Sequence, residues 1–500
     1  MSGAPLWLAG SLLALSNFFV VLDITITNVS VPNIAGGLAV SPDQGTWVIT
    51  SYAVAEAIMV PLSGWLSQRF GAVRVFAAAT LGFGACSALC GFAPSLSALV
   101  LFRVMQGVCG GPLIPLSQTL LRRIFPASKQ SAALGLWSMT TVVAPVAGPL
   151  LGGEIVDTVG WPWIFFINVP IAATVGVLLW RLLASRETAT ERRPVDFVGL
   201  ALLVTWVGSM QVMLDKGKDL DWFGSRLIVT LAIIALLGFA AFLIWELTDE
   251  HPIVDLRVFR HRGFVAAAIV MPLAYGSFFS SIVLLPLWLQ INLGYTATWA
   301  GRVTAFQGFL AVIMSPIVAR LTATKDARVL VTIGMVSLGA VTLWRSTFVT
   351  DVDFWTIVWP QVGLGFAIPF FFIPLTAVAL SSVLPRETTS AAGLLTFMRT
   401  TAAAFATSIT TTQWDNIATD RRVELAGALN GAGSTIDALT HAGFTSAQAL
   451  RQIDALVQSQ ALMLATDRVF FMTALVFVLA ALAIWIAPKP KRAAAAAGGH

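Results

Sequence analysis

Three ionisable residues, Asp23, Glu56 and Arg103, lie inside long apolar stretches of the N-terminal quarter of the chain. A charge within a bilayer costs about 2.5–3.5 kcal/mol or more, so such residues usually pair with one another or mark a pathway. Burial disfavours an ionised carboxyl group, whereas a nearby guanidinium group favours it. An arginine that moves between two conformations could therefore load and release a proton. A static ion pair between Arg103 and one acid is the alternative.

The three residues lie at similar depths in their apolar stretches. With a helical rise of about 1.5 Å per residue, Asp23 lies roughly 12 Å from the predicted outer end, Glu56 roughly 15 Å and Arg103 roughly 10 Å. We therefore predict that Asp23, Glu56 and Arg103 couple transport to protons, with Glu56 the weakest candidate.

The composition indicates a polytopic membrane protein that is entirely α-helical. Of the 500 residues, 57% are hydrophobic and only 11% are charged, against about 25% charged in soluble domains. The net charge of +5 does not indicate nucleic-acid binding, because the basic residues cluster in loops between apolar stretches. Cys86, Cys90 and Cys109 lie in apolar stretches, so neither a disulfide nor a metal site is expected.

Fourteen stretches are long enough to span a membrane, which requires about 20 mostly apolar residues. They cover residues 7–31, 46–66, 72–92, 96–121, 131–155, 162–184, 196–214, 226–246, 263–291, 297–321, 326–348, 353–380, 388–413 and 467–487. With a cytoplasmic N-terminus, most Lys and Arg residues fall on the inner side, and the short outer loops hold only Lys216, Lys218, Arg226 and Arg345. This positive-inside bias predicts that both termini are cytoplasmic.

A weak repeat indicates two similar halves. Thr46-Trp47 begins the second span and Thr298-Trp299 the tenth, and each span ends with a similar proline motif. We predict an N-terminal six-helix half over 1–184, a linker with two inserted helices over 185–262, a C-terminal six-helix half over 263–487 and a cytoplasmic tail over 488–500. Duplicated halves with a site between them are typical of transporters.

Five motifs occur in an order that matches one transporter family. They are Leu22–Pro32, Gly64–Gly71, Arg103–Gly107, Gly148–Gly153 and Trp161–Pro170. Together they resemble the 14-helix drug:proton antiporters of the major facilitator superfamily, the EmrB/QacA type. Over residues 15–487 the chain is most similar to the inner-membrane subunits of bacterial tripartite multidrug pumps.

This resemblance implies a major facilitator fold and proton-driven multidrug efflux by alternating access. The implied substrates are lipophilic or amphipathic compounds, including hydrophobic antibiotics and weakly acidic uncouplers. The energy source would be the proton gradient across the bacterial inner membrane, with no cofactor. A periplasmic membrane-fusion adaptor and an outer-membrane channel are the implied partners.

The second motif departs from the family pattern. The family usually has Asp where Gln68 stands and a basic residue at Ala72, so a latch that uses that acid is absent or altered. In the fifth span, two prolines predict a kink and small residues allow close helix contact. We predict that this span acts as a hinge between the inward-open and outward-open states. The alternative is that its small residues only pack against a neighbouring helix. The residues predicted to gate or pack are Gly64, Arg69, Gly71, Arg74, Pro145, Gly148, Pro149, Gly152 and Gly153.

Aromatic and polar side chains inside the spans are candidates for substrate binding. Apolar, aromatic linings suit lipophilic ligands, although most aromatic residues in spans face lipid or neighbouring helices. Arg399, near the middle of the thirteenth span, could bind substrate, balance charge or merely contact backbone carbonyls. The predicted substrate-binding residues are Thr25, Asn28, Gln106, Tyr275, Phe279, Phe370 and Arg399.

No enzyme motif is present, since the sequence contains no P-loop, no HExxH and no GxGxxG after a strand. A membrane-embedded enzyme would need a cluster of polar catalytic side chains, and a sensor or scaffold would not need a carboxylate at Asp23. Proton-coupled uptake is the alternative within the transporter class, and the fifth-span motif argues against it by resemblance. We therefore expect a transporter.

The longest outer segment, 414–466, is predicted to be a loop with two short amphipathic helices, 415–430 and 446–466. Their apolar faces must be buried against something. The resemblance points to the periplasmic adaptor, while the protein's own surface or the lipid headgroups are the alternatives. The apolar positions are Ile417, Val423, Leu425, Leu429, Ile453, Leu456, Val457 and Leu462.

Overall fold

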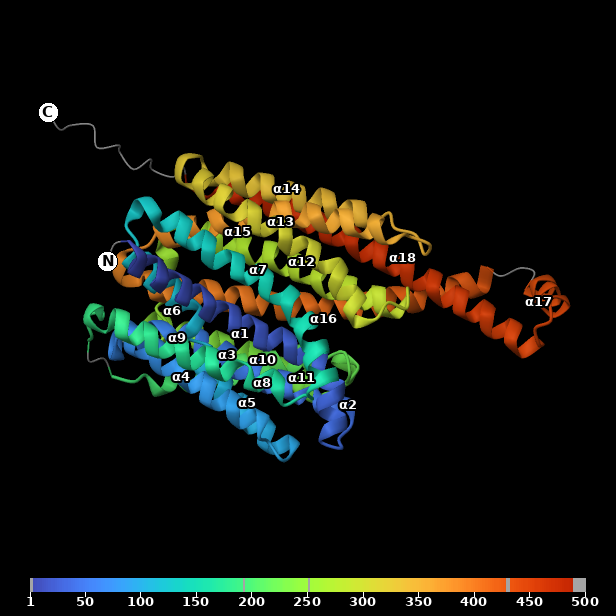
Figure 1. Cartoon of the computed structure of the whole chain (residues 1–500), viewed down its shortest axis with the longest axis horizontal. Helices are drawn as coiled ribbons and strands as arrows, with labels where there is room; N and C mark the ends of the chain where they lie inside the picture. Colours follow the sequence, from blue (N-terminus) through green and yellow to red (C-terminus); the bar gives the residue numbers. More distant parts are fainter. Residues whose placement is uncertain (1–2, 192–193, 251, 429–431, 489–500) are drawn as a thin grey trace.

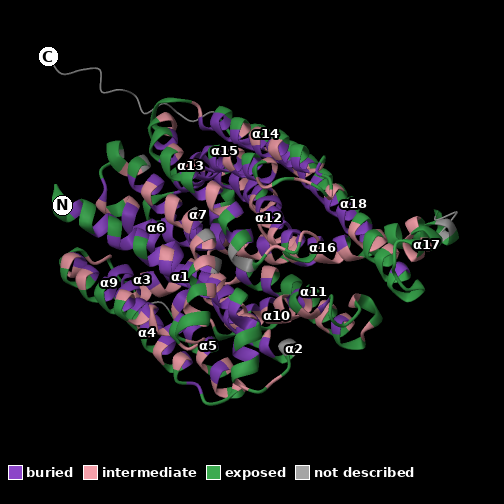
Figure 2. Ribbon diagram, turned by 45° about the vertical axis from the view of Figure 1, so that its right-hand side comes forward, coloured by how far each residue is buried: buried purple, intermediate pink, exposed green. Residues whose placement is uncertain are grey.

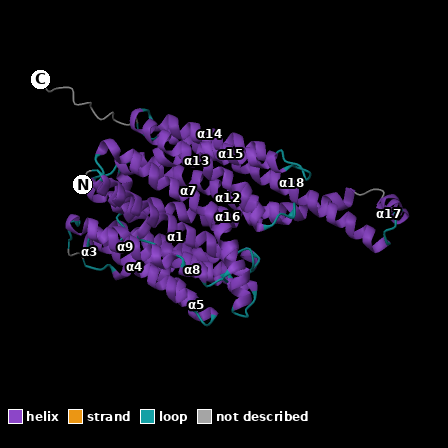
Figure 3. Cartoon of the chain, viewed as in Figure 1, coloured by secondary structure: helices purple, strands orange, loops and turns teal. Residues whose placement is uncertain are grey.

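The computed structural model describes residues 3–191, 194–250, 252–428 and 432–488, and within these ranges it contains helices and loops but no strand (Figure 3). The predicted all-α class is confirmed. A helix satisfies its backbone hydrogen bonds within one segment, which an apolar bilayer requires. The predicted tail 488–500 lies outside the described residues, apart from its first position.

The helices of the N-terminal part run between the two ends of the bundle (Figure 1), and α5 with α6, like α8 with α9, forms one span. They are α1 (Ala4–Gly37), α2 (Pro42–Gly45), α3 (Trp47–Phe70), α4 (Ala72–Gly91), α5 (Leu96–Gly110), α6 (Leu113–Ile124), α7 (Ala127–Thr158), α8 (Trp163–Phe166) and α9 (Asn168–Leu183). The inserted pair is α10 (Phe197–Lys216) and α11 (Arg226–Thr248), joined through the 3₁₀ turn η2 (Trp222–Gly224).

The C-terminal part contains the longest helices of the chain. They are α12 (Arg262–Ile291), α13 (Ala297–Thr324), α14 (Ala327–Arg345), α15 (Phe354–Ser381), α16 (Thr388–Ala428), α17 (Ala432–His441) and α18 (Ser446–Ala483). The 3₁₀ turn η4 (Pro385–Glu387) precedes α16. Ser95, Asp196, Asp326, Asp353 and Thr445 each accept a hydrogen bond from a backbone N–H of the helix that follows, and such caps explain where these helices begin.

Each of the fourteen predicted spans falls on a helix or on a pair of consecutive helices. In the described ranges, twelve helices are long and apolar enough to cross a membrane, or thirteen when the bent α7 is counted as one span. The helix α16 is not among them, because its apolar stretch is interrupted by Arg399 and many threonines. The bend in α7 measures 49° between Ser128–Pro145 and Leu150–Thr158, so the predicted proline kink is present.

Helices α1–α9, called the N-terminal half here, contact helices α12–α18, called the C-terminal half, along α7 and α13 and along α3 and α16. The end of the bundle with the loops after α3 and α6, where α1 begins and α18 ends, is called the basic end here (left in Figure 1). At this end, a Cβ atom on Gly64 would lie 3.1 Å from the Cα of Ser390, and one on Gly135 would lie 3.0 Å from the Cβ of Ala319. Such distances leave no room for a larger side chain, so the halves are in close contact there.

The inserted pair lies at the edge of the bundle. The helix α10 packs on α3 and α16, whereas α11 packs chiefly on α10. Much of the α11 surface is exposed and apolar (Figure 2), as at Leu236, Ile244 and Leu247. Because an exposed apolar helix of this length suits a lipid environment, α11 forms an outer wall of the protein.

The predicted outer loop 414–466 is largely a continuation of two membrane helices. The structure has α16 unbroken to Ala428 and α18 unbroken from Ser446, so 415–430 and 446–466 do not form separate short helices. The two extensions and α17 project beyond the bundle (Figure 1); we call them the helical hairpin. An ion pair of 2.7 Å joins Arg422 to Asp454 across it.

The apolar residues of the helical hairpin are only partly covered by the hairpin itself. Leu462 is buried, and Ile417, Leu425, Ile453 and Val457 are half-buried. Val423 is 69% exposed and Leu456 is 57% exposed, while Leu429 lies outside the described residues. The hairpin therefore leaves part of its predicted apolar face open.

Arg345 differs from its predicted place in a short outer loop. It ends α14 and is only 1% exposed, with its guanidinium group 4.7 Å from the ring centroid of Phe470 in α18. The flanking sequence is polar enough to suggest a loop, but packing of α14 on α18 covers the side chain.

Candidate functional site

Asp23 lies in α1 with no exposed surface, where α1 faces α5 and α9. Its Oδ2 accepts a hydrogen bond of 2.6 Å from the Arg103 guanidinium group. Its Oδ1 accepts bonds from the amide nitrogens of Gln106, at 3.1 Å, and Asn168, at 2.8 Å. All three contacts are donors, which is the arrangement that an ionised carboxylate requires.

Arg103 is held from several sides in α5. Besides Asp23, it donates to the backbone carbonyl of Val48 at 3.0 Å and to the side-chain oxygen of Gln106 at 2.7 Å. Its guanidinium carbon lies 4.2 Å from the ring centroid of Tyr52 in α3. A buried ion pair is stabilising only when further hydrogen bonds satisfy both partners, and here they do.

Glu56 does not join this network. It is buried in α3, and its Oε1 has no hydrogen-bond partner among the described residues. Its helix α3 packs on α16, which carries Arg399. The predicted trio is therefore a tight Asp23–Arg103 pair, and Glu56 lies outside its hydrogen bonds.

Arg399 lies at the contact between the halves and is surrounded by aromatic rings. Its guanidinium carbon is 5.2 Å from the ring centroid of Tyr275, 5.6 Å from Phe372 and 5.9 Å from Trp137. The Nε of Arg399 has no partner among the described residues. A cavity of only about 10 Å³ adjoins the side chain, and a space of this volume does not accommodate a drug-sized ligand.

The predicted substrate-binding residues are distributed over several environments. Tyr275 lies beside Arg399 at the centre, and it stacks on Phe279 with ring centroids 6.0 Å apart. Gln106 belongs to the Asp23 network instead. Phe370 packs with Val318 and Ile373 away from the centre. The remaining two are Thr25, which bonds to backbone carbonyls, and Asn28, which is exposed.

The small residues of α7 lie against α1 next to the acidic site. A Cβ atom on Gly148 would lie 2.7 Å from the Cβ of Thr25, and one on Gly152 would lie 2.8 Å from Val29. Gly153 has nothing within 4 Å of that position, so its predicted packing role is not supported. Pro145 is half-buried at the bend, and the side chain of Pro149 lies outside the described part of the structure.

The loop between α3 and α4 carries the remaining predicted gating residues. Gly71 has φ of 95°, a conformation that favours glycine. The guanidinium carbon of Arg69 lies 5.3 Å from the Trp65 ring centroid. Gly64 contacts Ser390 of the other half, as described above, and Arg74 lies 4.0 Å from the carboxylate of Glu187.

Glu187 supplies a carboxylate close to the loop whose usual acid is replaced by Gln68. Its two carboxylate oxygens accept hydrogen bonds of 2.9 Å from the backbone N–H groups of Val73 and Arg74, in the first turn of α4. Its own backbone carbonyl accepts a bond of 2.9 Å from Arg123. A carboxylate is stabilising at a helix N-terminus, so the linker after α9 ties the loop down.

A polar cavity of about 700 Å³ lies between the halves at the basic end, lined in part by Gln68, Arg122 and Glu387. Glu387 pairs with Arg260 and with His261, the latter at 2.8 Å. Burial raises the pKa of Glu387, but the bonds from His261 and Leu384 and the charge of Arg260 outweigh it, so the pKa lies below its ordinary value. The ion pair of Glu387 with Arg260 is therefore lost only as the pH falls through that lowered pKa.

Several residues of the site were not predicted from the sequence. Asn168 lies in one of the quoted motifs, yet its bond to Asp23 depends on α9 packing beside α1. Tyr52, Trp137 and Glu187 had no assigned role. Asn168 could have been identified as a site residue because it is a polar side chain in an apolar stretch. No feature of the sequence identified Glu187.

Known proteins resemble the chain over its whole length. Residues 13–407 match the Major Facilitator Superfamily. The chain is 45% identical over 504 residues to the multidrug export protein EmrB of Escherichia coli strain K12, covering 100% of this chain and 98% of that protein. It is 41% identical over 505 residues to the fatty acid resistance protein FarB of Neisseria gonorrhoeae, covering 100% and 99%. The solved proton:xylose symporter XylE shares the fold, with a TM-score of 0.60, 14% identity and coverage of 98% of this chain and 97% of that chain.

Proposed function

The chain belongs to the major facilitator superfamily and is a multi-pass membrane transporter rather than an enzyme, and from this premise we propose that it is a proton-driven multidrug efflux antiporter of the bacterial inner membrane. The full-length similarity to proteins named for multidrug export and fatty acid resistance supports lipophilic compounds as substrates. The positive-inside bias supports cytoplasmic termini.

The observation that carries this proposal is the buried pairing of Asp23 with Arg103. Three donors hold the carboxylate, and no solvent reaches it. Protonation of Asp23 removes the negative charge that Arg103 faces, and an unpaired buried arginine is costly. Protonation thus favours a conformation in which Arg103 finds another partner, and this links a proton to a movement of α1 relative to α5.

The bent helix α7 transmits this movement in the proposed mechanism. Gly148 packs directly on Thr25, which stands only two positions after Asp23. Because α7 also packs along α13 of the other half, a shift of α1 changes the contact between the halves. Packed helices tend to switch between discrete arrangements rather than deform gradually.

Glu56 and Arg399 contribute a second charge interaction between the halves. They belong to α3 and α16, which are in contact, and each has one polar atom without a partner in the described structure. Opening the centre for substrate would increase their separation and weaken their attraction. We propose that they favour the conformation seen here, in which α3 contacts α16.

The helical hairpin is the proposed docking surface for a periplasmic adaptor, which would pass the substrate to an outer-membrane channel. Its exposed Val423 and Leu456 are apolar residues on helices that project beyond the bundle (Figure 1). Direct transfer would keep a lipophilic compound from returning to the inner membrane.

The function is tested with the purified full-length chain in liposomes. A proton gradient imposed across the membrane should drive uphill movement of a hydrophobic antibiotic, and a protonophore should abolish it. Addition of the antibiotic should in turn move protons, reported by a pH-sensitive dye inside the vesicles. An antibiotic flux that changes neither with the proton gradient nor with the protonophore would overturn proton-coupled antiport.

A further inference from the structure

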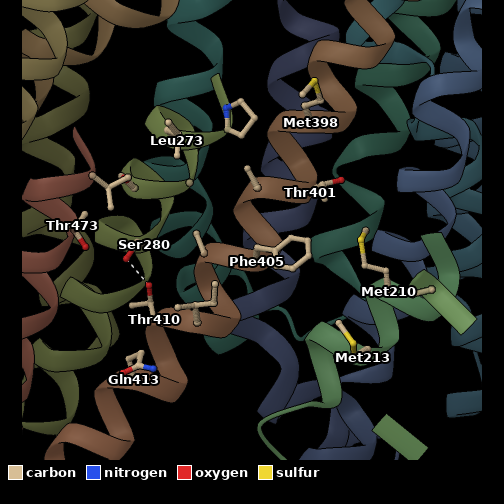
Figure 4. Close-up of a pocket in the computed structure, with 18 of the residues that line it drawn as sticks. Met210, Met213, Leu273, Ser280, Met398, Thr401, Phe405, Thr410, Gln413 and Thr473 are labelled. Carbon is tan, nitrogen blue, oxygen red and sulfur yellow. Dashed lines mark hydrogen bonds between the residues drawn. The ribbon is translucent and has the colours of Figure 1, made fainter. Parts of the chain in front are cut away.

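The inserted helices form one side of a large cavity that lies apart from the Asp23 site. Its volume is about 900 Å³, within the usual range of ligand pockets of about 300–1,000 Å³. Figure 4 shows Met210 and Met213 of α10 on one side and Leu273, Ser280 and Thr473 of α12 and α18 on the other. The helix α16 lies between them and forms the floor.

The lining of this cavity is apolar and adaptable. None of the residues that line it is charged, and four of the twelve methionines of the chain are among them: Met210, Met213, Met398 and Met472. Methionine side chains are flexible and polarisable, and surfaces rich in them bind ligands of varied shape. Aromatic rings, including Phe397 and Phe405, complete the walls.

Two buried polar groups in the lining have no partner in the described structure. They are the Nε1 of Trp206, a donor, and the hydroxyl of Thr401, which can donate or accept. The ring of Trp206 packs on Phe397, one helical turn from Thr401, with centroids 5.6 Å apart. An unpaired buried donor is costly, so a ligand with a hydrogen-bond acceptor would be favoured here.

The cavity opens sideways toward the bilayer. Leu236 of α11 and Ile409 of α16 line it and are themselves largely exposed. Along α16 the lining runs from Phe397 to Gln413, roughly 24 Å at the helical rise, which is most of the bilayer's thickness. An apolar space of this size offers water few partners, so its occupant must come from the hydrocarbon phase.

We propose that this cavity is a membrane-side binding site for the exported compounds, taking uncharged lipophilic molecules that carry a hydrogen-bond acceptor. The methionine-rich wall and the unpaired Trp206 and Thr401 favour varied acceptor-bearing ligands over a plain hydrocarbon chain. The site uses helices α12 and α16, which also carry Tyr275 and Arg399 of the centre. The identity of the ligands as exported compounds rests on the proposed function.

The experiment is photolabelling of the full chain in lipid nanodiscs without a proton gradient. The probe is a lipophilic benzophenone ketone, whose carbonyl is both the photoreactive group and a hydrogen-bond acceptor, and labelled peptides are identified by mass spectrometry. Labelling should concentrate in 206–213 and 397–413 and fall with an excess of an unlabelled exported antibiotic. Labelling confined to peptides around Asp23 and Arg103, or unaffected by the antibiotic, would overturn the proposal.

Matched substitutions in α11 separate filling of the cavity from a general effect on the helix. Ala232→Phe adds a ring at a lining position, whereas Ala240→Phe adds the same ring at an exposed position outside the lining. We expect Ala232→Phe to remove most of the labelling and Ala240→Phe to leave it unchanged. Equal labelling of the two variants would contradict the assignment.

Two substitutions test the polar groups: Thr401→Val keeps the shape of the side chain, and Trp206→Phe removes the indole N–H together with part of the ring system. Trp206→Phe and Thr401→Val should each weaken binding of the ketone by about 2- to 10-fold, the value of one hydrogen bond. The same variants should bind an acceptor-free alkyl diazirine as the wild type does. If phospholipid displaces the ketone and exported antibiotics do not, the cavity is a lipid site and the proposal is wrong.

These experiments can reject the proposed binding site and the proposed antiport independently of each other. Antibiotic-sensitive labelling in a chain that shows no proton-coupled flux in liposomes would reject the proposed antiport while retaining the binding site. Flux that is normal in Ala232→Phe, together with labelling only at the centre, would retain the function and reject the membrane-side site.

Discussion

Asp23 and Arg103 stand eighty positions apart on different helices, and a contact of 2.6 Å joins Oδ2 of the first to the guanidinium group of the second in a buried interior. Gln106 and Asn168 complete the shell around the carboxylate. The pair is thus both a structural tie between α1 and α5 and the proposed site of proton exchange, and substitutions can separate these roles.

Asp23→Asn should abolish proton-coupled antibiotic flux in liposomes, because the amide keeps the shape of the side chain but cannot carry the proton. The amount of protein in the membrane should stay near that of the wild type. Asp157→Asn, which changes an exposed acid at the end of α7, serves as the control and should transport normally. Wild-type exchange by Asp23→Asn would refute the assignment.

Arg103→Ala should destabilise the protein by about 3–5 kcal/mol, because Asp23 is left buried and without its counter-charge. Thermal unfolding in detergent measures the loss. Combining it with Asp23→Asn should recover much of that stability without restoring transport. A double variant no more stable than Arg103→Ala would show that the guanidinium group acts mainly through Val48 and Tyr52 rather than through the acid.

Gly148→Leu should block transport while the protein still reaches the membrane, because the side chain would overlap Thr25 and Ile26 in α1. Overpacking of this kind costs about 1–3 kcal/mol. Gly153→Leu is the matched control in the same helix, since open space surrounds that position. Whole-cell efflux compares them, and equal activity of the two variants would rule out a role for the close contact.

Glu187→Gln should weaken the closure at the basic end and slow efflux, because the carboxylate at the start of α4 contributes about 0.3–1 kcal/mol, or up to 2 kcal/mol when partly buried. Adding Gln68→Asp should restore activity by returning an acid to the loop, whereas Gln68→Asp alone should change little. The efflux rates of the four proteins provide the test. Failure of the second substitution to restore activity would show that the two positions are not equivalent.

Val423→Asp and Leu456→Asp should abolish drug resistance in cells and leave antibiotic flux in liposomes intact, because they place charges on the proposed adaptor surface. Gln452→Asp adds the same charge at an exposed polar position of the helical hairpin and should have no effect. Cysteines at 423 and 456 should crosslink the adaptor in cells. Resistance that survives both substitutions would indicate that the pump works without the hairpin.

The positions of the membrane helices could be predicted from the sequence, because a bilayer requires long apolar segments and that signal is local. The proline bend in α7 was readable from a local signal too, although Pro316 and Pro374 lie inside α13 and α15, which continue past them. The depths of Asp23, Glu56 and Arg103 follow from counting residues along single helices. The resemblance of the motifs also placed the chain in its family, which the comparisons bear out.

The direction in which each side chain points depends on contacts between helices distant in the chain. Depth alone could not decide that Arg103 pairs with Asp23 and leaves Glu56 without a hydrogen bond to its Oε1 among the described residues. Nor could it bring Asn168 to Asp23, or Glu187 to the start of α4 beside the loop that lacks its usual acid.

Helix length beyond the membrane was also decided by tertiary structure. The fall in hydropathy after residue 413 predicted that the membrane helix ends there, whereas α16 continues to Ala428. A helix can continue into water because its backbone hydrogen bonds lie within the helix itself. Arg345 shows the converse, because packing of α14 on α18 buries a charge that hydropathy assigned to water. Local sequence thus determined which segments are helical and how deep each residue lies, and packing between remote segments determined what each residue contacts.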